Sequence, residues 1–196
     1  MYNEGRVDFS HVKTVNLDEY AGLSGDNDQS YRYFMNHNLF DHINIDKKNT
    51  FVASGMGDFE ANARELEEKV REGGAADLQL LGIGNNGHIA FNEASDHLIA
   101  VAHTEKLTES TINANARFFE KKEDVPTMAI TMGMGDILAA KKVVLAATGL
   151  AKVPAIKGLI MDDVITTQNP STMLKMHEDA VVVIDRELAD AVGYRA

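Results

Sequence analysis

The sequence contains no cysteine among its 196 residues. This absence excludes a disulfide framework and a metal site built on thiolates. Proline is scarce as well, with three in the chain, and no Pro/Gly-rich linker, internal repeat or low-complexity tract divides the sequence. We therefore expect residues 1–196 to form a single domain, and a chain of this length can bury a sizeable core.

Basic residues are few relative to acidic ones. Lys and Arg number 19 against 30 Asp and Glu, which gives a formal net charge of −11, and no stretch gathers the basic side chains together. This balance repels polyphosphate backbones and excludes a nucleic-acid partner. The sequence also lacks a signal-peptide pattern and any hydrophobic run of membrane-spanning length. These absences predict a cytoplasmic protein with no membrane partner.

Short β-branched apolar runs alternate with longer amphipathic stretches. The runs predict strands at residues 12–17, 78–83, 98–103, 128–132, 143–147 and 181–184. Helical patterns occupy residues 31–40, 59–72, 108–117, 135–140, 151–160 and 171–176. Strands and helices in alternation imply a mostly parallel sheet with helices on both faces. The fold class we expect is α/β, a three-layer αβα sandwich with a Rossmann-like sheet.

The most informative segment is residues 81–93, where an apolar strand runs into a glycine turn. Glycine lets the backbone approach a ligand closely, so we expect Gly84 and Gly87 to lie against a substrate. His88 can exchange a proton near neutral pH, and Glu93 can orient it or share that work. The remaining six histidines lack the spacing of metal ligands, so no metal site is expected: His11, His37, His42, His97, His103 and His177.

Polar residues also come directly after two other predicted strands. Asp18 lies after the first of them, and Lys152 lies after the strand at 143–147, at the start of a helix. The carboxyl ends of parallel strands line one crevice, so these side chains and His88 are expected to face one pocket. Asp18 is a candidate base there, while Lys152 and Arg117 are candidate anion contacts. A phosphorylated small molecule suits this set.

Alternatives compete with each of these interpretations. An acidic residue after a strand, such as Asp18, is also typical of a solvated loop. Arg117 and Lys152 are also typical of ordinary surface charges. The glycines at 82, 84 and 87 also spell a dinucleotide-binding fingerprint, with Glu105 near the distance of a ribose-binding acid. However, the next strand is predicted from Leu98, which leaves little room for the helix that must hold a pyrophosphate.

The residues at 82–93 resemble the hallmark Gly-x-Gly-x-(Asp/Asn)-Gly-His-Ile-(Ala/Gly)-Phe-Asn-Glu of the glucosamine-6-phosphate deaminases (isomerases). The resemblance spans nearly the whole chain, and it continues at residues 16–20, 29–31, 38–42, 115–119, 130–135 and 149–152. The related 6-phosphogluconolactonases share the fold, but their histidine motif continues differently.

This resemblance implies a reaction that needs no metal or organic cofactor. Glucosamine 6-phosphate and water would give fructose 6-phosphate and ammonia. His88 would move the proton that opens the sugar ring, with help from Glu93 and Asn86, and Asp18 would transfer the C2 proton to C1. Arg117 and Lys152, with Gly84 and Gly87, would bind the substrate.

The chain departs from the family pattern in three places. Asn86 stands where many members have an aspartate, and it can orient His88 but cannot ionise. Residues 94–96 stand where a proline is common. Members begin with a strand and a phosphate-binding loop, and residues 1–5 resemble the segment that comes after that unit. We therefore expect an N-terminally truncated member with a sheet strand left unpaired.

Three interpretations remain open from the sequence: an active deaminase, a non-catalytic sugar-phosphate-binding remnant, and a 6-phosphogluconolactonase-like hydrolase. In each case the partner is a small sugar phosphate and the chain is a monomer or small homo-oligomer.

Overall fold

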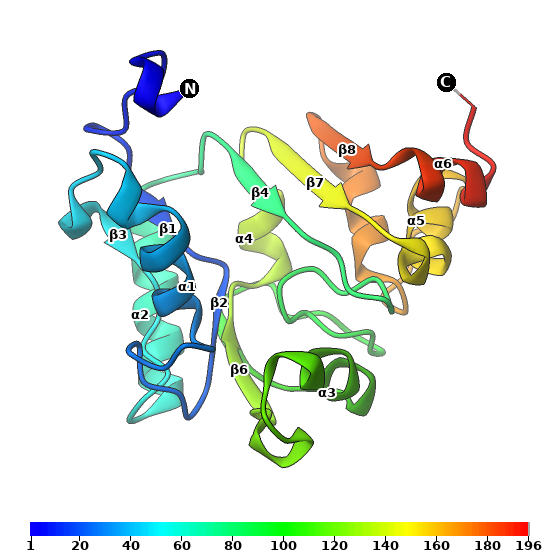
Figure 1. Cartoon of the computed structure of the whole chain (residues 1–196). Coiled ribbons are helices and arrows are strands. Elements are labelled where there is room, and N and C mark those ends of the chain that lie inside the picture. Colours follow the sequence, from blue (N-terminus) through cyan, green and yellow to red (C-terminus); the bar gives the residue numbers. More distant parts are fainter. Residues whose placement is uncertain (196) are drawn as a thin grey trace.

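The computed structural model describes residues 1–195 and builds them into strands, helices and short 3-10 turns (Figure 1). Three strands form a parallel sheet in the order β4-β7-β8: β4 (Gln79–Leu81), β7 (Val143–Ala147) and β8 (Ala180–Ile184). All three coincide, at least in part, with strands that the apolar runs predict. The α/β class is therefore confirmed.

Two further sheets are small. β1 (Thr14–Val15) and β3 (Thr50–Phe51) pair in parallel. β2 (Asp18–Tyr20), β6 (Met128–Thr131) and β5 (His103–Lys106) form an antiparallel sheet in the order β2-β6-β5. The antiparallel sheet is not expected from the alternating pattern, and the strand predicted at 12–17 is shorter than expected, since a new strand begins at Asp18.

The helices begin mostly at residues whose side chains cap them. Ser30, Asp58, Thr108 and Asp185 each accept a hydrogen bond from a backbone N–H of the first turn, which satisfies a donor that the helix leaves free. The helices are α1 (Tyr31–Asn38), α2 (Phe59–Glu72), α3 (Glu109–Asn115), α4 (Met134–Leu138), α5 (Val153–Ile160) and α6 (Arg186–Val192). α6 is not predicted by the sequence patterns, and the helix predicted at 171–176 is a 3-10 helix at Pro170–Met176.

The prediction of a strand at 98–103 is wrong for residues 98–102, because backbone groups there hydrogen-bond to the start of α4, and only His103 lies in a strand, β5. Ile99 O and Ala100 O accept hydrogen bonds from Met134 N and Asp136 N, and Ala102 N donates to Glu67 on α2. Gly133 has no Cβ, which lets the loop approach closely: a Cβ there would overlap the backbone of residues 100 and 101. These hydrogen bonds occupy the peptide N–H and C=O groups that a strand would need for pairing.

The main core lies between the β4-β7-β8 sheet and the helices. Leu145 on β7 is fully buried together with side chains from four helices: Leu66, Ile137, Ile156 and Leu188. A second cluster of buried side chains joins Tyr20 on β2 to Phe91, Leu107 and Ala129. The second cluster connects the antiparallel sheet to the loop after β4. None of the helices within residues 1–195 is long and apolar enough to cross a membrane.

Candidate active site

The loop after β4 folds back on itself and presents His88. Gly84 N donates to the backbone O of His88 at 2.9 Å, and the N–H of His88 donates to Asn86 Oδ1 at 3.2 Å. The His88 ring occupies the space that a Cβ on Gly84 would take. Gly87 has a φ of +84° and lies against Asn169, whose Oδ1 a Cβ would also overlap. Packing within the protein therefore requires glycine at both positions. Contact of Gly84 and Gly87 with a substrate stays a prediction.

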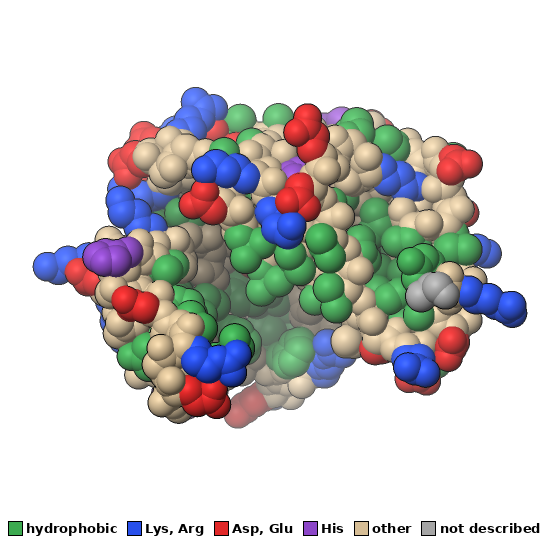
Figure 2. All heavy atoms as spheres, turned by 90° about the horizontal axis from the view of Figure 1, so that it is seen from above, with side chains coloured by type: hydrophobic (Ala, Val, Ile, Leu, Met, Phe, Trp, Pro, Cys, Tyr) green, Lys and Arg blue, Asp and Glu red, His purple; other side chains and the backbone are tan. Residues whose placement is uncertain are grey.

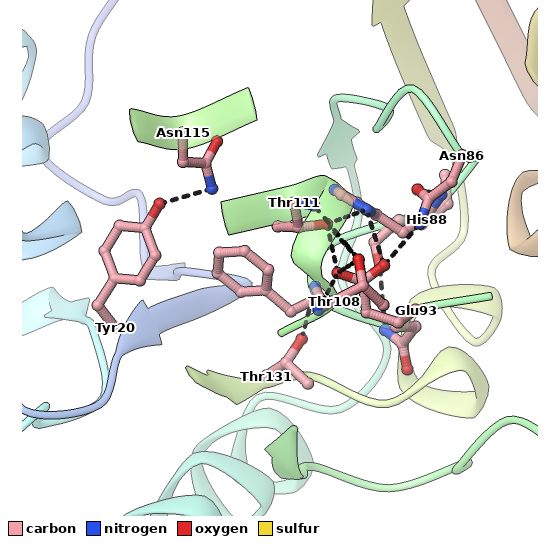
Figure 3. A network of polar contacts seen from close by, with 11 residues as sticks. Tyr20, Asn86, His88, Glu93, Thr108, Thr111, Asn115 and Thr131 are labelled. Carbon is pink, nitrogen blue, oxygen red and sulfur yellow. Dashed lines mark hydrogen bonds and ion pairs between the residues drawn. The ribbon is translucent and has the colours of Figure 1, made fainter. Parts of the chain in front are cut away.

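Glu93 is the centre of a polar network beside His88 (Figure 3). Its Oε2 lies 3.3 Å from His88 Nδ1 and accepts a hydrogen bond of 2.7 Å from Asn86 Nδ2. Its Oε1 accepts from the hydroxyls of Thr108, at 3.2 Å, and Thr111. The structure thus brings His88, Glu93 and Asn86 into contact, and their joint role in catalysis stays a prediction.

This network keeps Glu93 ionised. Burial by itself disfavours the charged carboxylate. The hydrogen bond and the charge of His88, together with hydrogen bonds from Thr111 and Asn86, outweigh the effect of burial and lower the pKa of Glu93 to about 2. A fixed negative charge beside Nδ1 favours the tautomer that carries its proton there. His88 Nε2 is then the nitrogen available for proton transfer.

Thr108 and Thr111 are site residues that the sequence does not reveal. The sequence marks Thr108 only as a cap of α3, and a threonine inside a helix carries no signal of its own. Thr111 is buried, and its Oγ1 also lies 3.4 Å from His88 Nδ1. The first turn of α3 therefore positions both His88 and Glu93.

The antiparallel sheet links Asp18 to the loop that carries His88, and its place in the site stays a prediction. Asp18 is the register partner of Thr131 on β6, and Thr131 Oγ1 accepts a 3.1 Å hydrogen bond from the backbone N–H of Phe91, which lies between His88 and Glu93 in the chain. Burial of its carboxyl, with the neighbouring charge of Glu19, raises the pKa of Asp18 to about 7. A base with this pKa is half ionised at neutral pH.

Glu19, the neighbour of Asp18, has a structural role. Its carboxylate is buried and accepts hydrogen bonds from the backbone N–H groups of Tyr20, Tyr31 and Arg32. Two of these donors belong to the first turn of α1, where free N–H groups favour a negative charge. Glu19 therefore holds β2 against α1 and fixes the position of Asp18.

Arg117 and Lys152 are near enough for their charges to interact, although 35 positions separate them. Burial, and then the charge of Arg117, lower the pKa of Lys152. The Arg117 guanidinium stacks over the Phe118 ring at 4.6 Å. Neither cation forms an ion pair with a carboxylate among residues 1–195. Two neighbouring cations without an acidic partner are suited to an anion such as phosphate.

The described residues hold no group of three or more His, Asp or Glu side chains arranged to bind a metal ion. Taken separately, these groups suit proton transfer and anion binding: His88 beside an ionised Glu93, Asp18 with a pKa raised to about 7, and the cations Arg117 and Lys152.

Comparison with known proteins agrees with this geometry. Residues 1–183 match the family described as glucosamine-6-phosphate isomerases/6-phosphogluconolactonase. A glucosamine-6-phosphate deaminase of Clostridium beijerinckii is 54% identical over 193 residues, which cover 98% of this chain and 79% of the relative. One from Clostridium perfringens is 53% identical, over 96% of this chain and 78% of its own length.

Solved structures show the same fold. A monomeric glucosamine-6-phosphate deaminase superposes with a TM-score of 0.93 at 40% identity, covering 97% of this chain and 79% of that one. A 6-phosphogluconolactonase from Thermotoga maritima superposes with a TM-score of 0.71 at 18% identity, covering 92% of this chain and 76% of its own, which shows likeness of fold alone. The family match and the identity to these relatives show that the chain belongs to the glucosamine-6-phosphate isomerase/6-phosphogluconolactonase family.

Proposed function

We propose that this chain converts glucosamine 6-phosphate and water to fructose 6-phosphate and ammonia. The observation that carries the proposal is the His88–Glu93 pair, a histidine held 3.3 Å from a carboxylate that its surroundings keep ionised. The names of relatives more than half identical to this chain support the same substrate. The reaction is a proton-transfer isomerisation that ends in hydrolysis, and it requires no group beyond side chains and water.

His88 acts in the opening of the sugar ring. Its Nε2 takes the proton of the C1 hydroxyl, and the ring oxygen receives a proton as the bond between C1 and that oxygen breaks. The imidazolium that forms between these transfers carries a positive charge beside Glu93, whose carboxylate stabilises it. Asn86, which cannot ionise, holds Glu93 in place through its amide.

Asp18 acts in the second stage. Its carboxylate takes the proton from C2 of the open-chain amino sugar, which gives an enolamine, and the same carboxyl returns the proton to C1. The product is an imine at C2, and addition of water to this imine releases ammonia and leaves the ketone. Arg117 and Lys152 bind the 6-phosphate, and the backbone at Gly84 and Gly87 lies against the sugar.

Ammonia release from glucosamine 6-phosphate tests the proposal directly. We expect release by the native chain and a loss of roughly 10²- to 10⁴-fold in His88→Ala, because a general acid–base contributes about that much. Retained sugar-phosphate binding without release would instead identify a non-catalytic binding protein. Hydrolysis of 6-phosphogluconolactone in place of deamination would identify a lactonase. Either result contradicts the proposal.

Gly84→Ala is expected to lower the rate of ammonia release roughly 100-fold or more, because the new Cβ takes the space of the His88 ring. Gly82→Ala is the matched control, since a Cβ there meets no atom within 4 Å. Its activity is expected to stay near native. Equal activity of the two variants would show that the position of the ring is not important.

Thr111→Val is expected to lower kcat roughly 10- to 100-fold, because it removes the hydroxyl that contacts both Glu93 and His88. Thr111→Ser keeps that hydroxyl and is expected to retain most of the activity. The pKa of Glu93, followed by NMR titration of its carboxyl carbon, is the second readout, and loss of a donor to Glu93 should raise it. An unchanged pKa of Glu93 in a folded Thr111→Val variant would argue against this role.

A cytoplasmic location, a single domain over residues 1–196 and a monomeric state are part of the same proposal. The last of these is supported by the monomeric deaminase of similar fold.

A further inference from the structure

Tyr20 on β2 is a buried side chain that contacts two separate segments of the proposed site. It is 4% exposed, and its ring packs against Phe91, from the loop between His88 and Glu93, with 5.5 Å between the ring centroids. The same ring meets Phe119 edge-on, at 5.9 Å and 78°. Tyr20 therefore joins the loop of His88 to the segment that follows α3.

The hydroxyl of Tyr20 forms a second contact with that segment. It accepts a 2.9 Å hydrogen bond from Nδ2 of Asn115, the last residue of α3, and Figure 3 shows this bond beside the polar network of Glu93. The 3-10 turn Ala116–Phe118, which carries Arg117, begins directly after Asn115 and ends directly before Phe119. Most of this turn is exposed. Tyr20 thus holds the turn at both ends, through its hydroxyl at one end and through its ring at the other.

Asp18 lies on the same side of β2 as Tyr20. The two residues are the first and third of a strand, and alternate side chains of a strand point to the same side. Burial, and then the charge of Asp18, raise the pKa of Tyr20 to about 12. The hydroxyl therefore keeps its proton at neutral pH and is a constant hydrogen-bonding group near the proposed base.

We propose that Tyr20 is a positioning residue that fixes the place of Arg117 relative to Asp18 and to the loop of His88. This inference rests on the proposed function, in which Arg117 binds the 6-phosphate while Asp18 and His88 act at the other end of the sugar. A substrate that spans these groups binds more tightly when their spacing is fixed beforehand, because ordering a turn on binding weakens affinity. Tyr20 acts through Asn115 and Phe119, so it needs no contact with the substrate.

Tyr20→Phe tests this role, because it removes the hydroxyl and keeps the ring. The KM for glucosamine 6-phosphate is expected to rise roughly 3- to 10-fold, about the contribution of one hydrogen bond between neutral groups. The kcat should stay within about twofold of native, since the phosphate lies far from the reacting carbons. Tyr33→Phe is the matched control, because Tyr33 is a tyrosine of α1 that is 37% exposed. Its KM should stay near native.

Asn115→Ala removes the other partner of the same hydrogen bond and should raise KM by a similar factor. The double variant of Tyr20→Phe and Asn115→Ala should show about the effect of one single substitution, because both remove one interaction. Asn113→Ala is the control on the same helix, since Asn113 is exposed.

Inorganic phosphate gives a readout that does not require activity. The increase in Tm that phosphate causes should be smaller in Tyr20→Phe and in Asn115→Ala than in the native chain. Figure 2 shows Lys and Arg side chains dispersed among Asp and Glu over the face that it presents, so phosphate is expected to bind weakly there. A native chain that releases no ammonia would contradict the proposed function, and the phosphate comparison would still test the role of Tyr20.

Three results would overturn the inference. The first is an unchanged KM and an unchanged phosphate effect in both single variants. The second is a loss of kcat at constant KM in Tyr20→Phe, which would show that the hydroxyl acts on the reacting atoms. The third is a double variant whose KM rises by the product of the single effects, which would show that Tyr20 and Asn115 act separately.

Discussion

Replacing Asp18 by asparagine is expected to lower the rate of ammonia release roughly 10²- to 10⁴-fold and, at the same time, to stabilise the protein at alkaline pH. The loss of activity is expected because an amide cannot accept the C2 proton. In the native chain, kcat/KM is expected to rise with pH through about 7, where the carboxyl of Asp18 ionises. This limb of the pH profile should be missing from the residual activity of Asp18→Asn.

The gain in stability is a consequence of the direction of the same pKa shift. The pKa of Asp18 rises from 3.8 to about 7 in the folded protein, so the native state binds more protons than the unfolded state between these pH values. The free energy of unfolding of the native chain therefore falls as the pH rises through this window, by up to about 4 kcal/mol. Asp18→Asn lacks this dependence, so its advantage over the native chain should grow from about pH 4 to about pH 7.

Urea unfolding of both proteins at several pH values measures this difference. Asp190→Asn is the control, since Asp190 is an exposed carboxylate on α6. Its stability should track that of the native chain at each pH. A constant difference between Asp18→Asn and the native chain would show that Asp18 titrates normally, and would remove the physical reason for its role as base.

Removing Arg117 or Lys152 is expected to raise the KM for glucosamine 6-phosphate, by roughly 10- to 100-fold for each alanine substitution, with a smaller effect on kcat. The phosphate lies far from the reacting carbons, so the two cations contribute binding that is largely equal in the ground and transition states. The double variant should show less than the product of the single effects, because the two charges repel each other in the free protein.

Inorganic phosphate provides a second readout that does not depend on activity. It should raise the Tm of the native chain, and the increase should be smaller in Arg117→Ala and Lys152→Ala. Lys121→Ala removes an exposed cation from the segment after α3 and is the matched control. A phosphate effect that is equal in all four proteins would place the anion elsewhere.

The sequence alone grouped His88 with Glu93, the proposed catalytic pair, because the signal is local. His88 and Glu93 are five residues apart, and the glycines that let the loop turn are in the same segment. The strands at β4, β7 and β8 were predicted for a similar reason, since continuous apolar runs are typical of buried parallel strands. The limits of α2 were also predicted, because Asp58 and the glycines at 73 and 74 mark its ends.

Only the tertiary structure decided which distant residues complete the site. Thr108 and Thr111 contact Glu93 across 15 and 18 positions of the chain, and a hydroxyl acquires this role only from the groups that it faces. The peptide groups of Ile99, Ala100 and Ala102 bond to α4 and α2 in place of a strand, although the side chains of this segment suit a strand. The raised pKa of Asp18 likewise depends on packing. Burial is a property of the whole fold, and local sequence patterns do not determine it.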